Sequence, residues 1–94
     1  MKGAGGMNMM ADEKTVLRLL KTARGQIDGI IKMVEEDRYC MDISQQLTAA
    51  DAMLRRANRE ILSAHLKHCV ENARDDKERA DKIDELVKAL EKIL

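Results

Sequence analysis

Apolar residues recur along three stretches of the chain at intervals of three and four positions, which is the spacing of one face of an α-helix. The first stretch covers residues 12 to about 38, and the second, which opens with a capping pattern at Asp42, continues to about residue 72. The third follows a cap at Asp75 or Asp76 and continues to residue 94. The pattern therefore predicts an all-α protein with three amphipathic helices.

Each predicted helix has a defined apolar face. In the first, this face consists of Val16, Leu19, Leu20, Ala23, Ile27, Ile30, Ile31 and Val34; in the second, of Ile43, Leu47, Ala50, Leu54, Ala57 and Ile61; in the third, of Ile83, Leu86, Val87, Leu90, Ile93 and Leu94. Residues 1–11 have no such period and contain three glycines and four methionines. We interpret residues 1–11 as a flexible arm and residues 12–94 as one helical domain. A soft-metal role for Met7, Met9 and Met10 is the less favoured alternative.

Composition narrows the class of protein. Charged residues make up 36% of the 94-residue chain, and the chain carries no formal net charge. It has a single aromatic residue and no proline, and this composition argues against a disordered tail and an aromatic-cored β-sandwich. No apolar run approaches the length that crosses a bilayer, and the start has no secretory signal, so we expect a cytoplasmic protein. A chain this small, with a second helix about 45 Å long, is marginal as a monomer, and we predict an oligomer.

The chemistry of the sequence centres on two cysteines and a histidine. His65 and Cys69 are four residues apart, which stacks their side chains on one side of a helix. Cys40 precedes His65 by 25 residues, or about 37 Å of helix. If two copies of the second helix pack antiparallel, Cys40 of one copy meets His65 and Cys69 of the other. Two thiolates and an imidazole suit Cu(I) better than Mg²⁺ or Ca²⁺, and they leave Zn²⁺ one ligand short.

The spacing of these residues is equally compatible with a structural role. Cys40 and Cys69 then act as small apolar side chains, and His65 is an ordinary interface histidine. Tyr39 either donates a hydrogen bond to the ligand shell or fills the interface. His68 lies about 100° around the helix from Cys69, and we interpret it as solvent-facing.

Basic side chains gather on the sides of the helices that face away from the apolar residues. Either they bind phosphates or they form ordinary solvated faces, and taken singly the second interpretation is preferred. Gly25 and Gly29 lie on or beside the basic side, where each costs about 1 kcal/mol of helix stability, and bare backbone there permits close approach of a nucleic acid or another helix. The basic residues are Lys14, Arg18, Lys21, Arg24 and Lys32 in the first helix, and Arg55, Arg56 and Arg59 in the second.

Three segments of the sequence are similar to a known family. The run RGQIDGIIKMVEEDRYCMDI, followed by RRANREIL and HLKHC, resembles the copper-sensing CsoR family of bacterial transcriptional repressors over roughly residues 16–72. The resemblance implies a dimer whose first two helices form an antiparallel four-helix bundle, and dimers that pair into tetramers. It implies Cu(I) bound by Cys40 of one subunit and His65 and Cys69 of the other, with Tyr39 and Glu85 linking the site to the third helix.

The same resemblance implies a function and a DNA surface. The metal-free tetramer occupies operator DNA, and Cu(I) releases it and derepresses copper-export genes. The alternative is a repressor of the same wider family that senses persulfide or another thiol stress. The family's DNA contacts map onto Lys21, Arg24, Arg56 and Arg59, with Arg18 and Arg55 as neighbours. Leu19 stands where relatives can carry an arginine used for DNA, so the resemblance implies that this contact is either missing or supplied by Arg18.

Other functions fit the residues less well. Nickel and cobalt sensors use nitrogen ligands near the N-terminus and a histidine at the last cysteine position, whereas here no histidine precedes His65 and residue 69 is cysteine. Persulfide sensors lack the histidine, and formaldehyde sensors lack the second cysteine. The sequence has no arrangement of nucleophile, base and orienting group, so we expect no enzyme. A purely structural helical bundle is the remaining alternative.

Overall fold

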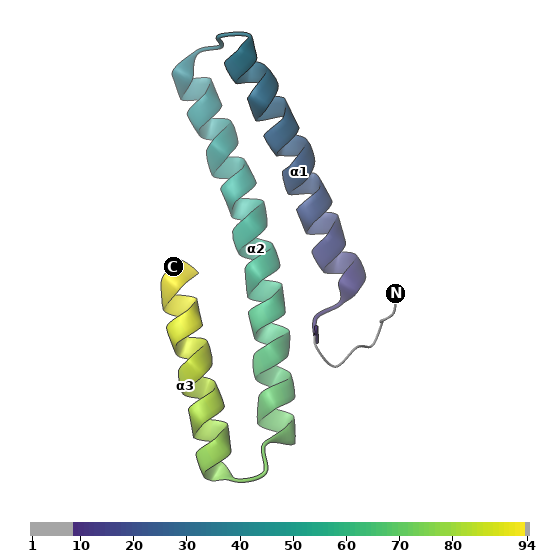
Figure 1. Ribbon diagram of the computed structural model, residues 1–94, viewed down its shortest axis with the longest axis vertical. Coiled ribbons are helices and arrows are strands. Elements are labelled where there is room, and N and C mark those ends of the chain that lie inside the picture. Colours follow the sequence, from purple (N-terminus) through teal and green to yellow (C-terminus); the bar gives the residue numbers. More distant parts are fainter. Residues whose placement is uncertain (1–8, 94) are drawn as a thin grey trace. The chain divides into compact units, whose positions relative to one another are not determined.

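The computed structural model describes residues 9–93 and contains three α-helices, which are α1 (Glu13–Glu35), α2 (Cys40–Asn72) and α3 (Asp76–Ile93) (Figure 1). The prediction of an all-α chain with three helices is confirmed. Two boundaries differ from the predicted ones. Helix α1 ends three residues earlier than predicted, and α2 begins two residues earlier. Most of the predicted arm, including Met7, lies outside the described residues.

The early end of α1 has a local cause. Asp37 has a φ angle of 54°, which is left-handed backbone outside the helical range. The Arg38 N–H donates to the Met33 carbonyl at 3.0 Å, and the Asp37 N–H donates to the Val34 carbonyl at 3.1 Å. This pair of bonds is the Schellman arrangement that closes a helix, here with aspartate at the position that glycine usually takes.

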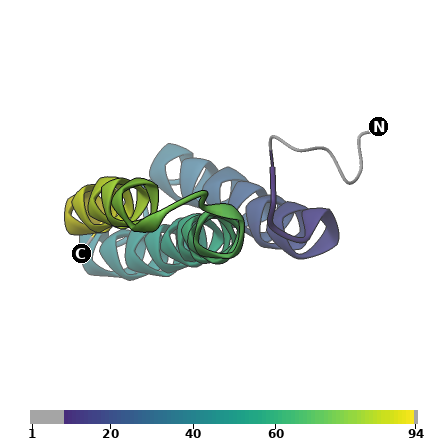
Figure 2. The same cartoon turned by 90° about the horizontal axis from the view of Figure 1, so that it is seen from below.

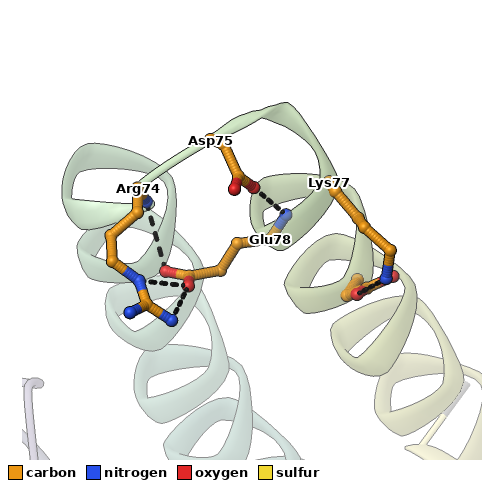
Figure 3. A network of polar contacts seen from close by, with 5 residues as sticks. Arg74, Asp75, Lys77 and Glu78 are labelled. Atoms are coloured by element: carbon orange, nitrogen blue, oxygen red, sulfur yellow. Dashed lines mark hydrogen bonds and ion pairs between the residues drawn. The ribbon is translucent and has the colours of Figure 1, made fainter.

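Hydrogen bonds to a backbone carbonyl and to a carboxylate set the starts of α2 and α3. The Tyr39 carbonyl accepts hydrogen bonds from the Asp42 and Ile43 N–H groups at 3.0 and 3.2 Å, so helical bonding starts before Asp42. At the start of α3, the Asp75 carboxylate accepts from the Glu78 N–H at 2.8 Å (Figure 3). Asp75, one of the two predicted candidates, is therefore the cap of α3.

The chain divides into two compact units. One covers residues 14–57, in which α1 and the first part of α2 form an antiparallel hairpin (Figure 1). The other joins residues 9–13 to residues 58–93, and in it α3 returns along the second part of α2 in both views (Figures 1 and 2). None of the helices within residues 9–93 combines the length and the apolar character that a membrane span needs.

The buried core is small compared with the predicted apolar faces. Among the described residues, the buried apolar side chains are Val16, Leu19, Ala23, Ile30, Ala50, Ala57 and Leu86. Other members of the predicted faces stay 39% to 59% exposed, namely Leu20, Ile27, Ile31 and Val34 of α1, Leu47 and Leu54 of α2, and Ile83 and Val87 of α3. The apolar faces are therefore wider than one chain covers by itself.

Candidate metal site and basic surface

His65 and Cys69 lie in contact near the end of α2. The Cys69 Sγ atom is 3.5 Å from the His65 Nε2 atom, and both residues are half-buried. The contact arises from the helix itself, because residues four apart stand one turn above each other on the same side. The helix thus presents a thiol and an imidazole together, as their spacing predicts.

A carboxylate from α3 faces the same ring nitrogen. The Glu85 Oε1 atom is 3.9 Å from His65 Nε2, and the His65 and Glu85 side chains are 35% and 63% exposed. This distance corresponds to an ion pair only when the imidazole is protonated. Nothing in the helical spacing pointed to Glu85, which lies on a different helix; only the family resemblance singled it out.

The remaining predicted ligand stands at the start of α2. Cys40 is exposed at the first residue of the helix, and Tyr39 before it is 66% exposed. Within residues 9–93, no group of three or more His, Cys, Asp or Glu side chains could hold a metal ion. The described part of one chain therefore supplies two neighbouring soft donors, and the exposed Cys40 thiol belongs to the other unit.

His68 takes no part in the contact between His65 and Cys69. Its Nδ1 atom is 3.5 Å from the Asn72 Nδ2 atom, and the Asn72 amide donates to the His68 carbonyl at 2.8 Å. The His68 side chain is directed to the next turn of its own helix, and the residue is half-buried. His68 is therefore a suitable matched control for His65.

The predicted DNA-binding residues are exposed, but they differ in their partners. Arg18 and Lys21 border one shallow hollow on α1, and Arg24 and Arg56 are exposed. Arg55 forms an ion pair with Asp51, with its Nε atom 2.8 Å from the carboxylate. Arg59 is exposed and borders a mostly apolar hollow between α2 and α3.

Open space lies over the glycines of α1. A Cβ atom built on Gly25 or on Gly29 would meet no neighbouring atom within 4 Å. Neither glycine is therefore required by packing inside the described chain. The bare backbone at both positions is exposed and remains accessible to a partner.

Comparison with known proteins decides the family. A model of the metal-sensitive transcriptional repressor family matches residues 12–92 of the chain. The copper-sensing transcriptional repressor CsoR of Mycobacterium ulcerans is 46% identical over 78 residues, which are 83% of this chain and 67% of the relative. The chain belongs to the CsoR family. Another family member, CsoR of Bacillus subtilis, is 35% identical over 81 residues, which are 86% of this chain and 80% of the relative.

Solved structures of CsoR-family relatives share the fold. A copper-sensing repressor CsoR with Cu(I), from Geobacillus thermodenitrificans, matches with a TM-score of 0.71 and 34% identity, covering 84% of this chain and 82% of the other. The nickel-responsive transcriptional regulator InrS matches with a TM-score of 0.74 and 27% identity, covering 94% and 99%. The two solved relatives are named for different metals, Cu(I) for the repressor CsoR and nickel for InrS.

Proposed function

We propose that this chain is a Cu(I)-responsive transcriptional repressor, which binds operator DNA without metal and releases it when Cu(I) binds. Release derepresses genes for copper export. The observation that carries the proposal is the contact of the Cys69 thiol with the His65 imidazole at 3.5 Å, with the exposed Cys40 thiol left for a second copy of the chain. The donor set excludes a nickel site of the kind that needs a second histidine in place of Cys69.

The metal site forms between two copies of the chain. Cys40 of one copy joins His65 and Cys69 of the other, which gives two thiolates and one imidazole. This set fits Cu(I), a soft ion that accepts few ligands, and it lacks the oxygen donors that Mg²⁺ and Ca²⁺ require. Because both thiols must lose their protons, binding weakens as the pH falls.

The exposed apolar faces support the assembly that this site needs. Leu20, Ile27 and Ile31 of α1 and Leu47 and Leu54 of α2 all belong to the unit of residues 14–57 and are 42% to 53% exposed. A second copy packed antiparallel against this unit forms a four-helix bundle and removes these side chains from water. We propose that two such dimers then pair into a tetramer.

The contact of His65 with Glu85 links the metal site to α3. The same Nε2 atom faces both the Cys69 thiol and the Glu85 carboxylate. A ligating histidine commonly donates its other ring nitrogen to a carboxylate, and Glu85 is the residue that would hold a copper-bound His65 in this way. Occupation of the site would then be coupled to α3 through His65 and Glu85, and Tyr39 would add a phenol beside Cys40.

The basic residues of α1 and α2 supply the DNA surface. Arg18, Lys21, Arg24, Arg56 and Arg59 contact backbone phosphates, because the sequence carries no helix-turn-helix or zinc-finger signature for reading bases. Each lost phosphate contact lowers the salt dependence of binding by about one unit of slope.

Arg55 already forms an ion pair with the Asp51 carboxylate, so we expect it to contribute less to DNA binding than Arg56, its neighbour in the sequence. Replacing Arg56 with alanine should weaken DNA binding more, and lower the salt slope more, than replacing Arg55. Filter binding over a salt series measures both quantities. Equal slopes for the two variants would contradict this assignment.

The proposal is tested by measuring DNA affinity with and without copper. A labelled DNA fragment selected by the metal-free protein is titrated with reduced protein under anaerobic conditions, and fluorescence anisotropy reports binding. Saturating Cu(I) should weaken the affinity by roughly tenfold or more, the usual range of allosteric coupling. The His68→Ala variant should respond like the wild type, and the His65→Ala variant should bind DNA but ignore copper. Equal affinities of the wild type in both states would refute the proposal.

A further inference from the structure

Two methionines before α1 lie at the same hollow as the candidate metal ligand His65. Met9 and Met10 border a hollow of about 260 Å³ together with His65 and Glu85. These residues all belong to the unit formed by residues 9–13 and 58–93. Met9 is 37% exposed and Met10 is half-buried, so the segment is accessible from solvent while it borders the hollow.

The rest of the lining is apolar, which separates two roles for the methionines. Ile61, Leu62, Leu86 and Ala89 complete the hollow. If the methionines only cover these side chains, leucine at both positions performs the same task, because leucine has a similar size and apolar surface. If their sulfur atoms matter, leucine fails. The imidazole of His65 also borders the hollow, so two thioethers and a nitrogen donor, all of them ligands for a soft metal, share one site.

Thioether sulfur is a suitable ligand for the ion that the proposed function requires. Methionine and imidazole are both accepted by Cu(I), and the thioether has no proton to lose on binding. The long unbranched side chain has three rotatable bonds, so it adapts to a bound ion at little cost. The segment of Met9 and Met10 precedes α1 and has no regular structure, which leaves its backbone free to adjust.

We propose that Met9 and Met10, together with His65, form a second Cu(I) site of thioether and imidazole donors within one chain, from which the ion passes to the thiolate site. The inference rests on the proposed function, which makes Cu(I) the ion. The transfer is a ligand exchange without change of oxidation state. The bonds from copper to the methionine sulfurs break, bonds to the thiolates of Cys69 and of the second copy's Cys40 form, and the thiol protons pass to solvent.

Methyl NMR of methionine tests this site directly. The full chain is labelled with ¹³C at the methionine methyl groups, and the signals of Met9 and Met10 are assigned with the Met9→Leu and Met10→Leu variants. In a Cys40→Ala/Cys69→Ala background, one equivalent of Cu(I) should shift both signals and leave that of Met53 in place. The wild type is titrated in parallel, where the thiolates should take the ion together with His65 and leave both signals close to their metal-free positions. Unmoved Met9 and Met10 signals in the Cys40→Ala/Cys69→Ala protein would overturn the inference.

Affinity measurements separate a ligand from an apolar cover. In the thiol-free background, Met9→Leu/Met10→Leu should weaken Cu(I) binding roughly tenfold or more against a chromogenic Cu(I) chelator, and Met53→Leu should leave it unchanged. An unchanged affinity with leucine at both positions would show that the methionines only cover the hollow. If Cu(I) releases DNA from the wild type while both methyl signals stay in place in the thiol-free background, the inference fails and the proposed function stands. If the methyl signals shift but DNA affinity ignores Cu(I), the inference holds and the proposed function fails.

Discussion

Truncating the exposed apolar face of α1 should dissociate the proposed dimer without unfolding the helix. Ile27 and Ile31 are 42% and 51% exposed in the single chain, so a partner can bury a further half of the surface of each side chain. Full burial of such a side chain stabilises by about 1.5–3 kcal/mol, and the remaining half is therefore worth about 1 kcal/mol. The Ile27→Ala/Ile31→Ala variant removes four such side chains from each dimer. The loss of about 4 kcal/mol raises the dimer dissociation constant roughly a thousandfold.

Sedimentation equilibrium over a wide range of protein concentrations measures this constant. Alanine has a higher helix propensity than isoleucine, so the helical circular dichroism of the variant should persist even where the dimer has dissociated. Lys32→Ala, an exposed polar position beside Ile31, is the matched control and should dissociate like the wild type. A double variant that dissociates at the same concentration as the wild type would refute the assignment of this face to a second copy.

Three further predictions concern the metal site and the two helix junctions. His65→Ala should weaken Cu(I) binding roughly tenfold or more in a chelator competition while His68→Ala does not, and a thiol-stress sensor would keep its response to oxidant in both variants. Asp37→Gly should raise the free energy of unfolding by about 0.5–1 kcal/mol in urea denaturation, because glycine accepts the left-handed backbone without a Cβ penalty; an unchanged midpoint would contradict this. Hydrogen bonds from the Arg74 side chain and N–H hold the pKa of Glu78 below its ordinary value of 4.5. Its contribution to stability is therefore present above that pH and lost as the pH falls through the lowered pKa. The advantage of the wild type over Glu78→Gln in thermal unfolding should be full at neutral pH and disappear in acid, and a constant difference across that range would exclude this cause.

The sequence predicted the three helices because apolar periodicity is a property of local positions. It placed the end of α1 too late because the stop is made by Asp37, an aspartate in a conformation that glycine usually adopts. Periodicity also could not tell which apolar residues one chain buries. Leu19 and Leu20 belong to the same predicted face, yet they are 0% and 42% exposed. Only the packing of the helices separates the two.

The part of the candidate site that lies on a single helix was predictable from the sequence. His65 and Cys69 come together because both sit on one helix at a spacing of four residues. Glu85 reaches the same imidazole from another helix, and no spacing rule connects it to residue 65. The same reason kept Met9 and Met10 from being linked to His65, since a segment without periodicity gives no indication of where it folds back. The joining of Cys40 to the pair stays a prediction.

Complementation between two defective chains tests most directly whether the metal site is shared between subunits. One chain carries Cys40→Ala, the other carries His65→Ala/Cys69→Ala, and the two are mixed under conditions that let dimers exchange. Each variant alone should lose its Cu(I) to a chelator that cannot remove Cu(I) from the wild type. In the mixture, half of the dimers are hybrids with one complete site, so tight binding should return at about one Cu(I) per four chains. If the mixture binds no more Cu(I) than the separate chains do, the three ligands do not meet across a dimer interface.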